Sequence, residues 1–114
     1  MKRLLIILLS TLSIQVQAYT GEDFIEGITS DDTSLNSGAY GYLMGVIAIM
    51  TDKGIEGRCV TLPKGADLMG STEIVFGYIK ENANQGGLPA WVLIETALGE
   101  AHGFHEPKKN GWCW

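Results

Sequence analysis

Apolar side chains recur at helical spacing in several segments of the chain, separated by polar or glycine-rich stretches. In the first segment Phe24, Ile25 and Ile28 fall three to four residues apart, behind the acidic Glu22 and Asp23. This spacing predicts a short amphipathic helix with negative charge at its N-terminal end, where the helix dipole favours it. Residues 29–36 are polar and acidic, so we expect a loop there.

Residues 37–52 form the most apolar stretch after the N-terminal leader. Nearly every side of a helix over this segment would be apolar, which is typical of a central, buried helix. Gly38, Gly41 and Gly45 would share one face of it. Because each glycine costs about 1 kcal/mol relative to alanine inside a helix, their placement predicts that another helix crosses very close to that face. The GxxxG pair formed by Gly41 and Gly45 does not indicate membrane dimerisation in so short an apolar segment.

Two further helices are predicted in the second half of the chain, preceded by an extended segment over residues 59–62. Asp67 is a suitable N-cap for the third helix, and Pro89 suits the first turn of the fourth. The expected buried stripes are Leu68, Thr72, Val75, Phe76 and Ile79 in the third helix, and Trp91, Ile94, Leu98 and Ala101 in the fourth. On the fourth helix Glu95, Gly99 and Glu100 should face solvent, and Gly103 should end it. The pattern predicts an all-α fold: a small four-helix domain with a short extended segment before the third helix.

Residues 1–18 have the organisation of a secretory signal peptide. A basic start, Met1-Lys2-Arg3, precedes an apolar run over residues 4–16, and Val16-Gln17-Ala18 offers a site for cleavage after Ala18. The run of about 13 residues is too short to span a bilayer, and no cysteine follows it that could carry a lipid, so we expect no membrane anchor. The mature protein is predicted to be residues 19–114, folded as one domain.

Removal of the leader makes the chain strongly acidic. Loss of Lys2 and Arg3 leaves six basic residues against thirteen acidic ones, a net charge of −7. Such a charge disfavours binding to nucleic acid and to anionic membranes. It suits a basic protein partner, and it is equally compatible with a charge that only keeps the protein soluble.

The chain has two cysteines, Cys59 and Cys113. In an oxidising compartment a disulfide is the default use of two cysteines, so we predict that these two are bonded. The bridge would close a loop of roughly 55 residues and contribute about 4 kcal/mol by loop entropy. The polar segment at residues 106–111 would then be a turn that carries Cys113 back to Cys59.

The C-terminal segment also holds both histidines, His102 and His105, and so raises the question of catalysis. Together with Cys113 they supply three potential zinc ligands, but no second cluster supplies a fourth, and Gly103 interrupts the helix between them. A Cys–His nucleophile would need a free thiolate, which the expected disulfide removes. Neither a GxSxG motif nor a phosphate-binding glycine loop is present. We therefore predict a protein without metal, cofactor or enzymatic activity.

Four motifs follow one another along the mature chain: GEDFIEG from Gly21, AYGYLMGV from Ala39, CVTLPKGAD from Cys59 and LPAWVLIETALGEA from Leu88. In this order and spacing they resemble the Rap/Tai immunity proteins, periplasmic antidotes to the peptidoglycan amidases delivered by type VI secretion. The resemblance covers nearly the whole mature chain. It departs at Gly27 and Ala39, where relatives often carry cysteines, and at Cys113, which lies further beyond the last helix.

The resemblance implies a periplasmic helical protein, a possible homodimer, that blocks the active-site cleft of its cognate cell-wall amidase effector. Loops carry function more often than other segments. The partner-binding residues are therefore predicted in two loops: Asp31, Asp32, Asn82, Asn84 and Gln85. The alternative is a periplasmic acid-stress chaperone of the HdeA type, a class that is also short, helical and single-bridged.

Overall fold

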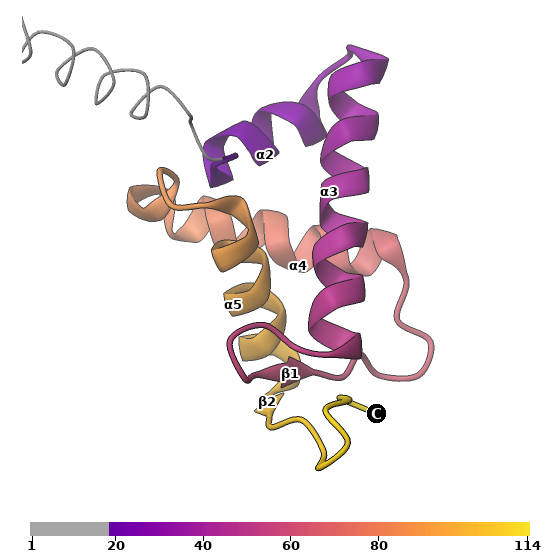
Figure 1. Ribbon diagram of the computed structural model, residues 1–114. Coiled ribbons are helices and arrows are strands. Elements are labelled where there is room, and N and C mark those ends of the chain that lie inside the picture. Colours follow the sequence, from indigo (N-terminus) through magenta and orange to yellow (C-terminus); the bar gives the residue numbers. More distant parts are fainter. Residues whose placement is uncertain (1–18) are drawn as a thin grey trace, which may run out of the picture.

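The computed structural model describes residues 19–114, so the predicted signal peptide lies outside the described residues. The predicted all-α class is confirmed: four α-helices and one disulfide build a small domain, with a two-stranded sheet as a minor addition. Helix α2 covers Gly21–Thr29 and α3 covers Thr33–Asp52, and they lie against each other at one end of the molecule (Figure 1). Helix α4 covers Leu68–Glu81 and α5 covers Ala90–His102, with the short 3₁₀ helix η1, Ala83–Gln85, between them.

The helix starts follow from side-chain capping. Thr20 and Asp23 form a reciprocal capping box at the start of α2, and the predicted N-cap Asp67 accepts a hydrogen bond from the backbone N–H of Gly70. The Asp32 carboxylate accepts from the N–H groups of Ser34 and Leu35, so α3 begins at Thr33. The sequence prediction started this helix at residue 37 and was wrong there. Half of the segment predicted as a loop, residues 33–36, is the first turn of α3, capped by Asp32.

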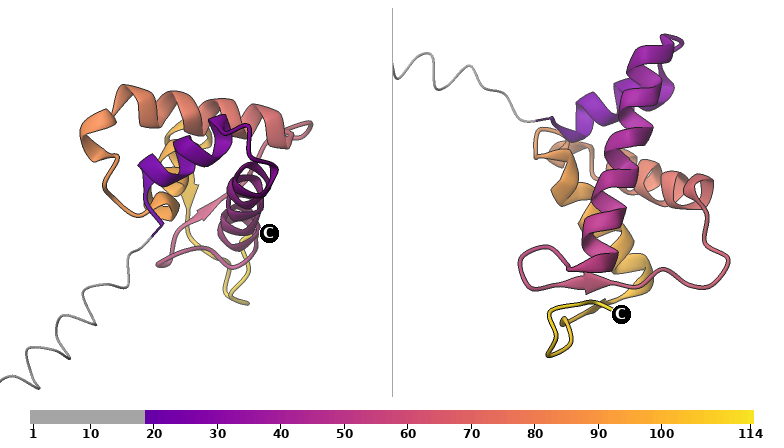
Figure 2. Two further views of the ribbon diagram at one scale, coloured as in Figure 1. Left: turned by 90° about the horizontal axis from the view of Figure 1, so that it is seen from above. Right: turned by 45° about the vertical axis from the view of Figure 1, so that its right-hand side comes forward.

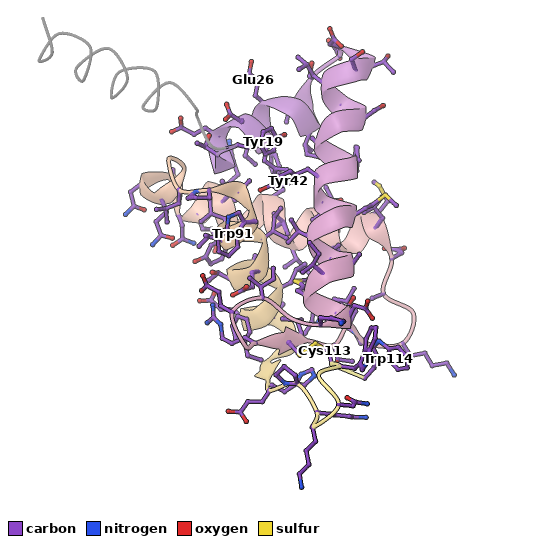
Figure 3. All side chains as sticks on the ribbon, viewed as in Figure 1. Tyr19, Glu26, Tyr42, Trp91, Cys113 and Trp114 are labelled. Atoms are coloured by element: carbon purple, nitrogen blue, oxygen red, sulfur yellow. A yellow bond between two sulfur atoms is a disulfide. The ribbon has the colours of Figure 1, made fainter. Side chains whose placement is uncertain are left out.

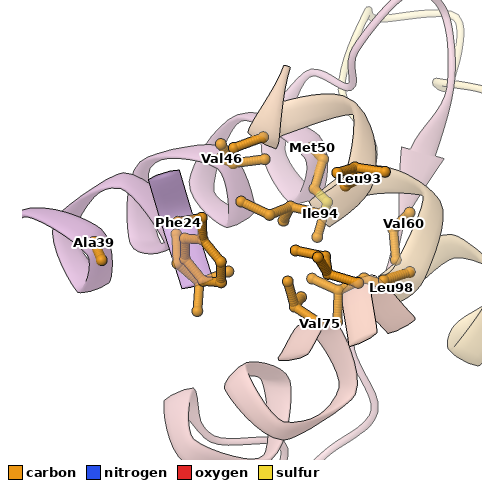
Figure 4. Close-up of a cluster of buried hydrophobic side chains, with 13 residues drawn as sticks. Phe24, Ala39, Val46, Met50, Val60, Val75, Leu93, Ile94 and Leu98 are labelled. Atoms are coloured by element: carbon orange, nitrogen blue, oxygen red, sulfur yellow. The ribbon is translucent and has the colours of Figure 1, made fainter. Parts of the chain in front are cut away.

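The hydrophobic core lies where α3, α4 and α5 meet. Met50 and Val46 come from α3, Val75 from α4, and Ile94 and Leu98 from α5 (Figure 4). Phe24 of α2 closes one end of this cluster, and Val60 of strand β1 closes the other. The stripe predicted for the third helix is confirmed at Thr72, Val75 and Ile79, which are buried. In the fourth helix Ile94 and Leu98 are buried, whereas Ala101, predicted to be buried, is exposed.

The predicted disulfide joins Cys59 to Cys113 and ties the C-terminal segment to the rest of the fold. Strand β1, Cys59–Val60, pairs antiparallel with β2, Phe104–His105. Beyond β2 the chain turns back through hydrogen bonds between Lys108, Gly111 and Trp112, and the N–H of Cys113 donates to the carbonyl of Asp52 at the end of α3. The segment therefore forms a return loop that is anchored by the bridge, as the sequence predicted.

Before β1, residues 53–58 form a tight turn that packs beside α5. Ile55 and Arg58 exchange two backbone hydrogen bonds, and the central residues Glu56 and Gly57 both have positive φ angles, of 51° and 78°. This is the geometry of a type I′ turn, whose twist suits a two-residue hairpin. The turn places Ile55 and Glu56 on one side, next to α3, and it directs Arg58 toward α5.

Candidate functional site

Helix α3 has one packed side and one bare side. Its buried residues are Ala39, Leu43, Val46 and Met50, one helical face. Seen from above, the other helices lie to one side of α3 (Figure 2). On the remaining surface Leu35, Met44 and Ile49 are more than half exposed, at 54%, 56% and 56%. No charged residue occurs between positions 37 and 50, so α3 presents an apolar surface to solvent.

The three aligned glycines of α3 belong to this bare surface. We expected another helix to cross close to Gly38, Gly41 and Gly45, and this expectation is wrong within the described residues. A Cβ atom built at any of the three meets no other atom within 4 Å. The cost of three glycines in a helix is thus not balanced by close packing inside the described domain. The three glycines form a strip without side chains along the exposed side of α3.

This arrangement makes Gly41→Ala a stabilising substitution. The new methyl group meets open space, and alanine favours the helix by about 1 kcal/mol over glycine, so urea denaturation should give a higher unfolding free energy by that amount. Gly99→Ala in α5 is the matched control. There a Cβ would overlap the ring of Phe104, and stability should fall. A decrease for Gly41→Ala would show that this strip is packed in solution.

Between α3, α5 and the type I′ turn lies an open hollow of about 520 Å³, which we call the α3–α5 groove. Its lining is almost entirely apolar and consists of Tyr42, Gly45, Val46, Ile49, Ile55, Glu56 and Trp91. The hydroxyl oxygen of Tyr42 accepts a hydrogen bond of 3.1 Å from the backbone N–H of Trp91, which fixes the two helices at this point (Figure 3). Burial raises the pKa of Tyr42, and the hydrogen bond from Trp91 opposes part of that rise.

A second hollow, the α2–α3 groove, opens on the other side of Tyr42. It is lined by Tyr19, Asp23, Glu26, Gly27, Ser34, Leu35, Gly38, Ala39 and Tyr42. The rings of Tyr19 and Tyr42 lie 4.5 Å apart between centroids and form the boundary between the two grooves (Figure 3). Burial raises the pKa of Tyr19, and the neighbouring carboxylate of Asp23 adds to the rise. Both grooves therefore run along α3 and share Tyr42.

The predicted partner-binding residues fall into two separate places. Asp31 and Asp32 lie between α2 and α3, beyond the C-terminal end of α2. Residues 82–85 lie near its N-terminal end, since the N–H of Glu22 donates to the carbonyl of Gly86. The structure thus does not bring the two groups together.

Some of these residues also have structural roles. Asp32 caps α3, and the Asn82 side chain donates to the carbonyl of Tyr78 at the end of α4. Gln85 is half-buried and lies 3.5 Å from the Tyr78 hydroxyl. Asp31 and Asn84 are exposed. A role of the five in partner binding stays a prediction.

Of the two C-terminal histidines, His105 contacts the chain around the disulfide. The Nε2 atom of His105 lies 3.1 Å from the carbonyl oxygen of Cys113 and 3.4 Å from the Thr61 hydroxyl. Cys113 is bonded to Cys59 and has no thiolate to offer a metal or a substrate. Within residues 19–114 no three histidine, cysteine or acidic side chains are grouped so that they could hold a metal ion.

Sequence reasoning placed Glu95 on the solvent side of α5, and the structure corrects this. Glu95 is only 1% exposed, and one carboxylate oxygen pairs with the guanidinium of Arg58, which reaches over from the type I′ turn. The other oxygen, Oε2, is buried without a hydrogen-bond partner. Burial raises the pKa of Glu95, while Arg58 opposes the rise. Gly99, also predicted to face out, is buried because the Phe104 ring lies against it.

Sequence reasoning missed the two grooves, although one signal was present. The fourteen uncharged residues at positions 37–50 could have indicated an apolar surface that is used for binding and not only for core packing. None of the described helices is long and apolar enough to cross a membrane. The arrangement is suited to binding, since it offers two hollows with largely apolar lining.

No family model, no curated protein and no solved structure matches the chain.

Proposed function

We propose that this chain is a periplasmic binding protein that inhibits a cell-wall amidase by covering its active-site cleft, and that it catalyses no reaction. The observation that carries the proposal is the bare, uncharged side of α3. Contiguous exposed apolar surface on a small domain marks an interaction site. The disulfide between Cys59 and Cys113 agrees with export to an oxidising compartment.

The motifs behind the Rap/Tai resemblance add a second line of support. Tyr42, Gly45 and Val46 belong to the second motif, and Trp91 belongs to the fourth. All four residues line the α3–α5 groove. Segments that suggested an amidase inhibitor by their order in the sequence therefore meet at one apolar surface.

The test is inhibition of purified enzymes. Residues 19–114, oxidised, are titrated into a panel of peptidoglycan amidases, and release of cell-wall peptides is measured at neutral pH. We expect one amidase of the panel to lose its activity at a one-to-one ratio, because occlusion is stoichiometric. A peptidoglycan glycosidase is the control and should keep its activity. If every amidase stays active with the protein present at micromolar concentration, amidase inhibition is wrong.

No observation favours the acid-stress chaperone as a second function. Such a protein must open in acid. Here the buried carboxylate of Glu95 has a raised pKa, so proton uptake relieves the cost of its burial as the pH falls. Taken alone, Glu95 thus stabilises the folded form in acid relative to neutral pH. If the purified protein kept unfolded client proteins from aggregating at pH 2 to 3, that result would support the chaperone function.

A further inference from the structure

The two grooves along α3 carry an electrostatic pattern as well as an apolar one. Their acidic lining residues are Asp23 and Glu26 in the α2–α3 groove and Glu56 in the α3–α5 groove. No lysine or arginine lines either groove. Acidic groups therefore stand at both ends of an apolar floor whose centre is Tyr42.

Two of these carboxylates are available to a partner. Asp23 already accepts a hydrogen bond from the backbone N–H of Thr20. Glu26 and Glu56 are exposed, and the one ion pair within residues 19–114 is that of Arg58 with Glu95. Neither glutamate therefore forms an ion pair with a basic side chain of the described domain.

We propose that the two grooves together bind a positively charged, amphipathic segment of a protein partner, with its apolar side chains over Tyr42 and Ile49 and its cationic side chains at Glu26 and Glu56. The inference rests on the proposed binding function and names the kind of segment that is bound. An amphipathic helix in an apolar groove is a common mode of recognition. Gly38 and Gly45 have no Cβ atom, and their places in the lining allow a partner backbone to approach closely.

Charge distinguishes this occupant from a second copy of the chain. Two copies facing each other through α3 would bring the same acidic groups, Glu26 and Glu56, to one interface. Each mature copy also carries a net charge of −7. Like charges across an interface suppress association. A cationic partner gains from the same groups, mostly in association rate and in specificity.

The experiment uses oxidised residues 19–114 labelled with ¹⁵N and a synthetic amphipathic peptide of about four helical turns, with leucines on one face and lysines on the other. We expect chemical-shift changes at Gly38, Gly45, Ile49 and the Trp91 indole, weakened by salt. The matched acidic peptide, in which glutamate replaces every lysine, should bind at least about tenfold more weakly. Charge reversal by Glu26→Lys with Glu56→Lys should weaken the basic peptide about fivefold to tenfold.

Gly45→Gln tests the groove without removing a core contact. Its side chain would enter the groove from an exposed helical position, where a Cβ meets nothing within 4 Å. Binding should fall at least about tenfold, while thermal stability stays at or above that of the wild type. Gly77→Gln is the matched control: a Cβ there is also unobstructed, but it lies on α4 and lines neither groove. It should leave binding unchanged.

Three results would overturn the inference: equal affinity for both peptides, shift changes only at residues outside the two grooves, or concentration-dependent changes at the grooves without peptide, which would make a second copy the occupant. The amidase assay keeps the two proposals apart. If the peptide binds as expected and no amidase is inhibited, the proposed function fails and the groove inference stands. If an amidase is inhibited equally by the Gly45→Gln protein, the groove inference fails and the proposed function stands.

Discussion

Replacing Cys59 and Cys113 together by serine is expected to lower the free energy of unfolding by about 4 kcal/mol. The bridge spans 54 residues, so its removal releases a long loop in the unfolded chain, and the entropy of that loop favours unfolding. The native state also loses buried sulfur contacts, since both cysteines are almost completely buried. Typical domains have a free energy of unfolding of about 5–15 kcal/mol. The loss of the bridge is the largest effect on stability that we expect from any substitution.

The loss should be visible in two measurements. Urea denaturation should give a clearly lower midpoint for the double serine variant, and the oxidised wild type treated with a reductant should move toward the same midpoint. Hydrogen exchange should show the greatest loss of protection at Val60 and Phe104, which pair with each other where β1 and β2 meet, next to the bridge. A midpoint equal to that of the oxidised wild type would mean that the return loop is held without the bond.

Most of the fold was predictable because local signals determine it. The start of α4 is set by the N-cap Asp67, and the end of α5 is set by Gly103, which has a positive φ angle of 90°. Both effects act within a few residues. The disulfide was predictable because two cysteines allow one pairing. The apolar stripe of α4 follows from period alone. These features need no knowledge of what lies opposite a helix.

The errors at the α3 glycines, Glu95 and Gly99 share one physical cause: the spacing of residues predicts which of them share a helix face, but not what packs against that face. The glycines of α3 share a face, as predicted, yet that face has no helix against it in the described domain. Glu95 lies on the polar side of α5, but the type I′ turn folds over that side and brings Arg58 to it. Gly99 is covered by Phe104 for the same reason: strand β2 returns across the end of α5. Turns and return loops that fold over the helices therefore determine whether these residues are buried or exposed.

Removing the partner of Glu95 is the second large expected effect. In the Arg58→Ala protein both carboxylate oxygens of Glu95 lie buried without a partner, since Oε2 has none even in the wild type. An uncompensated buried charge costs 3–5 kcal/mol. The Arg58 side chain is 51% exposed, so solvent screens its contribution, and we expect a loss of about 2 kcal/mol at pH 7. Lys80→Ala, at an exposed site on α4, should change stability by less than about 0.5 kcal/mol.

The pH dependence of that loss is the sharper measurement. Burial raises the pKa of Glu95, and Arg58 opposes the rise, so the pKa in the Arg58→Ala protein should lie higher still. An acid with a raised folded-state pKa costs stability where it is ionised, and the cost disappears as the pH falls through that pKa. The deficit relative to the wild type should therefore shrink as the pH is lowered from 7. Adding Glu95→Gln to Arg58→Ala should remove this pH dependence, because the amide cannot ionise. A deficit of the same size at pH 5 and pH 7 would instead assign the loss to the contact of Arg58 with the Phe104 ring, whose centroid lies 4.6 Å from the guanidinium carbon.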